Sequence, residues 1–298
     1  MAVSLANCLV IGVSSRALFD LDEENKIYEN EGLQAYAKYQ LEHESEILKP
    51  GSGFALIKAL LKLNERYGKH VVEVLIMSHN SADTSLRIFN SISHYQMDIT
   101  RAVLTGGASL TPYLKAFGVD LFLSANEDDV RVAIKDGFAA GRIYTNTIAD
   151  FDPMQEIEQI RIAFDGDAVL FSDEAEQIYQ KQGLEAFVEN EQKKAKLALP
   201  KGPFARFLKT ISNLQREVDQ DDAPIRTALV TARNAPAHER VIRTLRSWDV
   251  RIDEAFFLGG ITKTEVLKAF GPHIFFDDQK VHADKASVVV PSAQVVWD

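Results

Sequence analysis

The sequence predicts an α/β protein built from two tandem, Rossmann-like units, each with a doubly wound sheet and a small helical insert. Two observations predict this fold class. Short apolar and β-branched runs alternate with amphipathic segments, which is the pattern of a parallel sheet covered by helices. The chain also repeats itself at the level of specific residues.

The repeat is a tandem duplication rather than a consequence of shared periodicity. Residues 10–36 align without gaps with residues 161–187, and residues 73–126 align in the same way with residues 226–279. The second pair of blocks shares Gly-Gly and then Leu-Lys-Ala-Phe-Gly in one register. Common periodicity would align apolar positions, but not this many specific residues.

The duplication divides the chain into two units that meet near residues 145–156. We expect a first α/β unit over residues 1–150 and a second over residues 151–298. Each begins with a buried strand followed by a charged helical insert, which in the second unit covers about residues 174–200.

The elements of the second unit follow from its apolar runs. Five short runs predict buried parallel strands: Ile160–Phe164, Thr227–Val230, Ala255–Leu258, His273–Phe276 and Ser287–Val290. Apolar residues between Phe204 and Leu214 recur at helical spacing behind two prolines, which predicts a helix. Ligands of doubly wound sheets bind beyond the carboxyl ends of the strands, so the polar residues there are the candidate site.

Composition and charge exclude several classes of protein. Of 298 residues, 46% are hydrophobic and 26% charged, which is typical of a globular protein and not of a disordered one. The net charge of −10 argues against binding a nucleic-acid polymer, and the apolar runs are too short to span a membrane. Cys8 is the single cysteine and the first residues lack signal-peptide features, so we expect a cytoplasmic protein without disulfides.

Charged and hydroxyl side chains follow successive strands of the second unit. A single Asp at a strand end is usually a cap or turn residue, but acidic pairs brought together repel one another unless a cation neutralises them. Mg²⁺ prefers oxygen ligands and is the usual ion where phosphate also binds. The strand-end residues therefore predict a Mg²⁺ site beside a phosphate site: Asp165, Asp167, Thr231, Arg233, Lys263, Asp277 and Asp278.

These residues lie in strings that resemble a known family. IAFDGDAVLF resembles the DxDx(T/V) signature of the haloacid dehalogenase superfamily of phosphohydrolases, and LVTAR, GGITK and IFFDD resemble its later motifs, in order. More narrowly, VSSRALFDL, AFDGDAVLFSDE, LVTAR, TLRSW and PHIFFDDQ resemble the cytosolic type I 5′-nucleotidases, from about residue 8 to residue 280. The resemblance implies two haloacid dehalogenase-type units, the second of them catalytic.

The resemblance implies an Mg²⁺-dependent 5′-nucleotidase that cleaves nucleoside 5′-monophosphates to nucleoside and phosphate through an aspartyl-phosphate. Asp165 is then the nucleophile, and Asp167 protonates the leaving 5′-oxygen and later takes a proton from water. Thr231, Lys263 and Arg233 are the expected phosphate ligands. The expected Mg²⁺ ligands are Asp165, Asp167, Asp277 and Asp278.

The first unit lacks these groups at the aligned positions. Its catalytic carboxylates and lysine are replaced, since the alignment pairs Ser14 with Asp165, Arg16 with Asp167, Ser78 with Thr231, Leu110 with Lys263, and Ser124-Ala125 with Asp277-Asp278. We interpret the first unit as a non-catalytic copy that supports the fold. A role in the pocket, or in binding an effector, stays open.

Two other functions fit the same residues. One is a phosphatase for a different small phosphate monoester, and the other is a nucleotide-sensing protein, against which the intact set of charged residues argues. The expected partner is a nucleoside monophosphate. Self-association into a homo-oligomer and binding of a nucleotide effector also stay open.

Overall fold

The computed structural model describes residues 5, 7–145, 148, 152–219 and 222–297. Their ten strands form one sheet: β1 (Leu9–Val13), β2 (Val72–Ser78), β3 (Arg101–Leu104), β4 (Leu121–Ser124), β5 (Ala140–Ile143), β6 (Ile160–Phe164), β7 (Ile225–Thr231), β8 (Glu254–Phe257), β9 (Ile274–Asp277) and β10 (Ser292–Gln294). Every residue of β1 and β2 is buried, so both faces of the sheet are covered there.

The helices lie between the strands in both halves of the chain. In the first half they are α1 (Ser15–Leu18), α2 (Asp22–Glu31), α3 (Leu33–Glu42), α4 (Phe54–Tyr67), the 3₁₀ turn η1 (Asp83–Ser85), α5 (Leu86–His94), α6 (Thr111–Phe117) and α7 (Glu127–Lys135). In the second half they are the π-helical turn η2 (Gly166–Leu170), α8 (Glu174–Lys193), α9 (Ala205–Gln215), α10 (His238–Ser247), α11 (Lys263–Phe270) and α12 (Lys280–Ser287). No helix in these ranges has the length and apolar character needed to cross a membrane.

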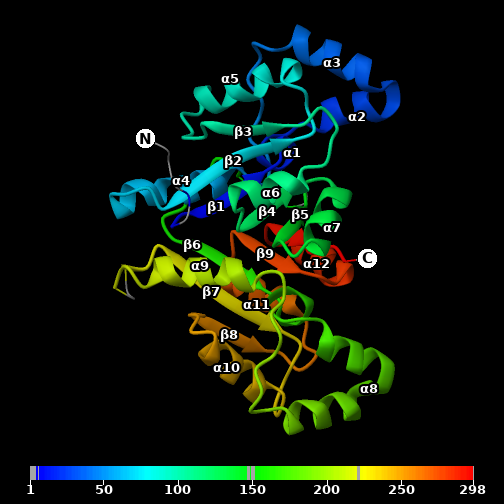
Figure 1. The fold of residues 1–298 in the computed structure, drawn as a ribbon, viewed down its shortest axis with the longest axis vertical. Helices are drawn as coiled ribbons and strands as arrows, with labels where there is room; N and C mark the ends of the chain where they lie inside the picture. Colours follow the sequence, from blue (N-terminus) through cyan, green and yellow to red (C-terminus); the bar gives the residue numbers. More distant parts are fainter. Residues whose placement is uncertain (1–4, 6, 146–147, 149–151, 220–221, 298) are drawn as a thin grey trace.

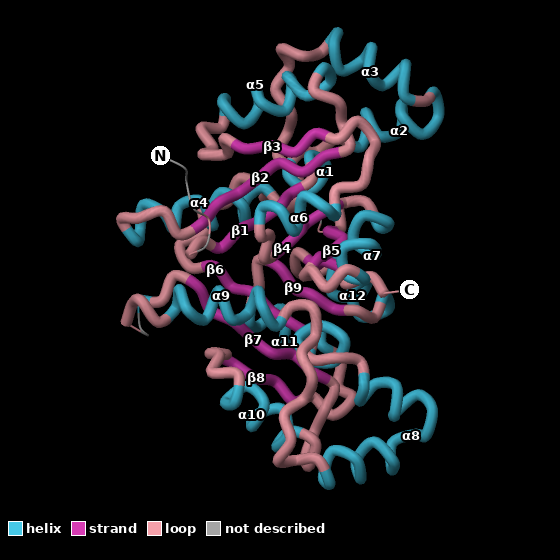
Figure 2. Tube along the Cα trace, in the orientation of Figure 1, coloured by secondary structure: helices cyan, strands magenta, loops and turns pink. Residues whose placement is uncertain are grey.

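The two halves have the same strand order. The sheet runs β3-β2-β1-β4-β5-β10-β9-β6-β7-β8, so each half read from its own outer edge gives third, second, first, fourth and fifth strand. Strands β5 and β10 pair antiparallel and join the halves into one continuous sheet, visible as the central run of strands in Figure 2. The inserts, α2–α3 and α8, lie at opposite ends of the molecule (Figure 1).

Backbone details repeat between the halves as well. Gly32 and Gly183 break their inserts with nearly identical dihedral angles, φ 84° and ψ −179° against φ 83° and ψ −178°. The positive φ favours glycine at both positions. Ser14 N donates to the carbonyl of Leu123 at 2.8 Å, and the aligned Asp165 N donates to Phe276 at 2.8 Å. The two first strands therefore end in the same way.

The ungapped alignment of the two halves does not hold in the turn that follows β1 in the first half and β6 in the second. Phe19 N donates to Ser15 O, four residues back, whereas Phe171 N donates to Gly166 O, five residues back. The second half therefore has one extra residue in this turn, where Ala168 has a φ of 60°. The turn is not a regular helix, because Asp167 and Ala168 both have non-helical dihedral angles. The extra residue lies between Gly166 and Phe171, so the pairing of Arg16 with Asp167 stays a prediction.

Most of the second-half elements lie where the sequence places them, with one exception. Strand β6 has the predicted bounds, and α9 covers the predicted helix. The predicted strand Ser287–Val290 is wrong, because Ser287 ends α12 and the amides of Val289 and Val290 turn back to Ala286 O. The fifth strand is β10, which follows Pro291. Burial of the end of α12 overrides the β-propensity of the three valines.

The insert is helical as expected, although α8 ends at Lys193 and residues 194–200 continue without helix. The expected boundary between units at residues 150 and 151 lies outside the described residues. The division into units 1–150 and 151–298 stays a prediction.

Candidate functional site

The carboxyl ends of three adjacent strands form the candidate site. Strands β9, β6 and β7 are neighbours in the sheet, and Asp277, Asp165 and Thr231 stand at or just after their ends. Lys263, the first residue of α11, follows β8. All four side chains are buried. Parallel strands bring these residues together because their carboxyl ends share one edge of the sheet.

Lys263 bridges two of the carboxylates. Its Nζ lies 2.9 Å from Asp165 Oδ2 and 2.7 Å from Asp277 Oδ2. Burial alone disfavours the ammonium charge, but the two carboxylates outweigh it and raise the pKa of Lys263. The lysine is therefore a fixed cation beside the proposed nucleophile.

Three carboxylates form a cluster suited to a cation. Asp165, Asp277 and Asp278 each offer an oxygen within 4.8 Å of the others. Burial and the neighbouring carboxylates raise the pKa of Asp165 to about 6 and that of Asp278 to about 8. These oxygens are the hard ligands that Mg²⁺ prefers, and a divalent ion offsets the repulsion that raises both values. The residues present fit an Mg²⁺ ion.

Asp167 is not among these three carboxylates. Its Oδ2 accepts from Arg233 Nε at 2.8 Å and its Oδ1 accepts from Arg233 Nη2 at 2.6 Å. The planar guanidinium matches both oxygens at once and holds the carboxylate away from the acidic cluster. The carboxylate cluster therefore comprises Asp165, Asp277 and Asp278, and the expected ligation of Mg²⁺ by Asp167 stays a prediction.

Arg233 is buried, with 4% of its surface exposed. Besides its two bonds to Asp167, its Nη1 donates to Glu191, and its guanidinium carbon lies 5.3 Å from the ring centroid of Phe187. Although burial opposes the charge, Asp167 and Glu191 raise the pKa of Arg233. Its Nε, Nη1 and Nη2 are all directed at carboxylates, so the phosphate contact expected of Arg233 stays a prediction.

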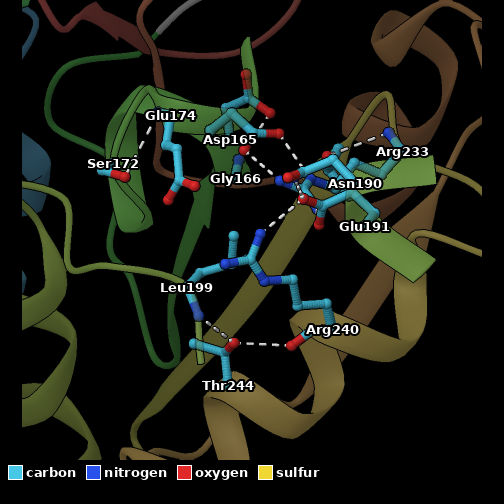
Figure 3. A network of polar contacts seen from close by, with 12 residues as sticks. Asp165, Gly166, Ser172, Glu174, Asn190, Glu191, Leu199, Arg233, Arg240 and Thr244 are labelled. Atoms are coloured by element: carbon cyan, nitrogen blue, oxygen red, sulfur yellow. Dashed lines mark hydrogen bonds and ion pairs between the residues drawn. The ribbon is translucent and has the colours of Figure 1, made fainter. Parts of the chain in front are cut away.

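Glu191 is a residue that the sequence analysis missed. It lies on α8 with 1% of its surface exposed, and it accepts from Arg233 and, at 2.7 Å, from Arg240 on α10. Figure 3 shows the guanidinium of Arg240 directed at Glu191. Glu191 stands in a run of charged residues that is typical of an exposed helix face, so the sequence carries no signal for its burial.

Thr231 is held against the turn that follows β6. Its Oγ1 accepts from Arg233 N at 3.2 Å. A Cβ atom at position 166 would lie 3.3 Å from the same Oγ1, so Gly166 lets the turn approach this hydroxyl closely. The indole of Trp297, which follows β10, donates to Ala168 O at 3.0 Å and so holds this turn in place.

His282 on α12 also lies beside the cluster, and the sequence analysis did not single it out. Its Nδ1 is 3.8 Å from Asp277 Oδ2, and burial together with Lys263 lowers the pKa of the imidazole. The contact depends on how α12 packs against the end of β9, which the spacing of residues does not reveal.

The aromatic residues of the insert repeat between the halves. Tyr179 and Phe187 meet edge to face at 6.3 Å and 83°, and Tyr28 and Tyr36 meet at 6.0 Å and 82°. Because the pair recurs in the half without the acidic cluster, its geometry favours a structural role over a base-stacking one.

The chain is similar in sequence to known proteins. A family model described as 5′-nucleotidase matches residues 1–298. The human protein named cytosolic 5′-nucleotidase 1B is 39% identical over 295 residues, which cover 94% of this chain and 47% of that protein. The chain thus spans about half the length of this curated relative. No solved structure matches the chain.

Proposed function

The chain belongs to the cytosolic type I 5′-nucleotidase family, and from this premise we propose that it hydrolyses nucleoside 5′-monophosphates to nucleoside and phosphate in the cytoplasm. The observation that carries the proposal is the contact of Lys263 with both Asp165 and Asp277, beside Asp278. A buried nucleophile, a fixed cation and a carboxylate cluster are what a phosphate dianion requires.

Asp165 supplies the attacking oxygen in the proposed reaction. One carboxylate oxygen bonds to phosphorus while the bond from phosphorus to the 5′-oxygen breaks, which leaves an aspartyl-phosphate. The attack is directed because Asp165 Oδ1 accepts from its neighbour, Gly166 N, at 2.7 Å, and Oδ2 is bound to Lys263. Both contacts fix the carboxylate before substrate arrives.

Asp167 is the general acid and then the general base of the proposed reaction. It protonates the leaving 5′-oxygen and then takes a proton from the water that attacks the aspartyl-phosphate. Each of its oxygens accepts one bond from Arg233 and keeps a second lone pair for these transfers.

The remaining residues bind the phosphoryl group. Thr231 Oγ1, close to the Gly166 turn, and the ammonium of Lys263, beside Asp165, are the donors for phosphate oxygens. Asp165, Asp277 and Asp278 would hold Mg²⁺. When bound, this ion offsets the charge that otherwise keeps a carboxylate away from a phosphate dianion.

Release of inorganic phosphate tests the proposal directly. Purified protein is incubated with AMP, IMP, CMP, UMP, the deoxynucleotides and a set of sugar phosphates, with Mg²⁺ or with EDTA. We expect Mg²⁺-dependent release from nucleoside monophosphates and little from sugar phosphates. Preferential release from a sugar phosphate would instead favour a phosphatase for another small monoester.

A further inference from the structure

A buried arginine occupies the same place in both halves of the molecule. Arg87 lies on α5 and Arg240 on α10, at positions that the repeat aligns. Arg87 Nε donates to Glu46 O at 3.0 Å, and Arg240 Nε donates to Leu197 O, also at 3.0 Å. The spacing of the first aligned block, continued through the insert, also pairs Glu46 with Leu197, so the two arginines have equivalent surroundings.

The two halves neutralise this arginine from different positions. Arg87 Nη1 donates to Glu24 on α2 at 2.6 Å, whereas Arg240 Nη1 donates to Glu191 on α8 at 2.7 Å. The register of residues 10–36 aligns Glu24 with Ala175, and the same spacing continued through the insert aligns Gln40 with Glu191. A buried arginine needs a carboxylate, and either position supplies one.

In the second half, the carboxylate of Glu191 has a second partner besides Arg240. Glu191 accepts from Arg233, which in turn binds both oxygens of Asp167. In the first half the residue aligned with Arg233 is Asn80, which accepts from Tyr36 Oη at 3.0 Å. Among the residues that the structure describes, the series of ion pairs from Arg240 through Glu191 and Arg233 to Asp167 lies in the half with the acidic cluster. The other half has Gln40 and Asn80 in place of Glu191 and Arg233.

We propose that Glu191 is a positioning residue of the catalytic site, which fixes Arg233 and through it the carboxylate of Asp167. Neutralising Arg240 does not explain the place of Glu191, because a glutamate at position 175 would supply a buried carboxylate, as Glu24 does for Arg87. Arg87 has a second and longer ion pair, 3.6 Å, with the exposed Glu46. The inference rests on the proposed function, in which Asp167 transfers the protons. Helix α8 of the insert thereby helps to orient Asp167.

The three nitrogens of the planar Arg233 guanidinium are shared between two carboxylates. Glu191 engages Nη1 while Asp167 engages Nε and Nη2, so the orientation of the plane is fixed from two sides. Without Glu191, the ring of Phe187 still lies below the guanidinium but leaves Nη1 without an acceptor. The plane and the bound carboxylate then gain freedom, and proton transfer depends on placement within fractions of an ångström.

Moving the glutamate from position 191 to position 175 distinguishes the positioning of Arg233 from the neutralisation of Arg240. Glu191→Gln removes the negative charge and replaces one of the two acceptor oxygens by an NH₂ donor, so it cannot accept from Arg233 and Arg240 as the carboxylate does. Glu191→Gln combined with Ala175→Glu restores a carboxylate for Arg240 in the arrangement of the first half. We expect the single variant to melt several degrees below wild type and the double variant to recover most of that loss. Both are expected to lose about tenfold in kcat on AMP, a part of what a general acid contributes.

The choice of substrate supplies a readout that a structural role would not move. p-Nitrophenyl phosphate has a leaving group that needs little protonation, so the double variant should lose no more than about threefold on it. An unchanged ratio of the two kcat values, or recovery of AMP hydrolysis together with Tm, would overturn the inference.

Glu24→Gln is the matched control. It breaks the equivalent buried ion pair in the first half, so it should lower Tm like Glu191→Gln while leaving the ratio of AMP to p-nitrophenyl phosphate turnover unchanged. If the double variant fails to fold, the comparison of Glu191→Gln with Glu24→Gln decides the question. An equal change of the ratio in both single variants would overturn the positioning role.

Hydrogen exchange tests the inference independently of the activity. The peptide over residues 165–171 should take up deuterium faster in the double variant than in wild type, without substrate, because Asp167 loses its fixed partner. Unchanged exchange would refute the positioning role. If wild type released no phosphate from any nucleotide, the proposed function would fail while this measurement still decided the role of Glu191.

Discussion

Lys263 Nζ lies between the carboxylates of Asp165 and Asp277, 2.9 Å from one and 2.7 Å from the other. The lysine thus pairs at the same time with the proposed nucleophile and with a proposed metal ligand. The aligned residue of the first half is Leu110, which has neither charge nor carboxylate partners. The contrast between the halves is what the proposed role of Lys263 in phosphate binding predicts.

Lys263→Leu should therefore abolish turnover and cost stability. Removing one partner of a buried ion pair costs about 3–5 kcal/mol, because the other charges stay buried. We expect at least a hundredfold loss of phosphate release and a lower Tm in EDTA, with part of the Tm recovered in Mg²⁺. Lys268→Leu, whose ion pair with Glu265 is exposed, is the control and should change neither quantity.

Asp165→Asn removes the attacking charge while keeping the size of the side chain. Turnover should fall by several orders of magnitude, and the circular dichroism spectrum should match that of wild type. Phosphate release and far-ultraviolet spectra on the same sample check both expectations. Near-normal turnover by the purified variant would contradict the covalent mechanism.

Much of this site follows from the sequence because strands fix it. Asp165, Thr231 and Asp277 end parallel strands, so the order of strands alone brings them to one edge. Glu191 and His282 lie on helices whose packing decides their neighbours, and no spacing along the chain encodes that packing.

The turn that carries Asp167 shows a second limit of sequence reasoning. Its extra residue distorts the backbone at Ala168 without disturbing the alignment of the flanking residues. The matching backbone contacts of Ser14 and Asp165 support the pairing of these two residues, whereas the extra residue leaves the pairing of Arg16 with Asp167 a prediction. The extra residue is apparent only in the backbone hydrogen bonds and dihedral angles of the folded chain.

Stability of the metal-free protein should fall as pH rises. The pKa values of Asp165 and Asp278 are raised, to about 6 and about 8, so the folded state binds more protons than the unfolded state between about pH 4 and pH 8. Raising pH across this window therefore favours unfolding. Differential scanning fluorimetry in EDTA should show a decreasing Tm from pH 5 to pH 8, and Asp278→Asn should flatten that slope.

Binding of Mg²⁺ should show the opposite dependence on pH. The ion requires ionised carboxylates, so binding must displace the protons held by Asp165 and Asp278. The increase in Tm caused by Mg²⁺ should grow from pH 5 to pH 8, and calorimetry in two buffers of different ionisation enthalpy should detect proton release. Asp277→Ala should raise the Mg²⁺ concentration needed for half-maximal activity. Full activity in EDTA would contradict the metal assignment.

The first half should contribute stability and not chemistry. Ser14 stands where Asp165 stands in the second half, but its Oγ accepts from Ala17 N at 3.2 Å and Ala125 N at 3.3 Å, as the N-cap of α1. Ser14→Ala should cost about 1 kcal/mol of stability through loss of the cap, and leave kcat within about twofold of wild type. Thermal unfolding and phosphate release on one preparation measure both effects, with Asp165→Ala as the aligned comparison. A tenfold loss of kcat in Ser14→Ala would place the first half within the catalytic machinery.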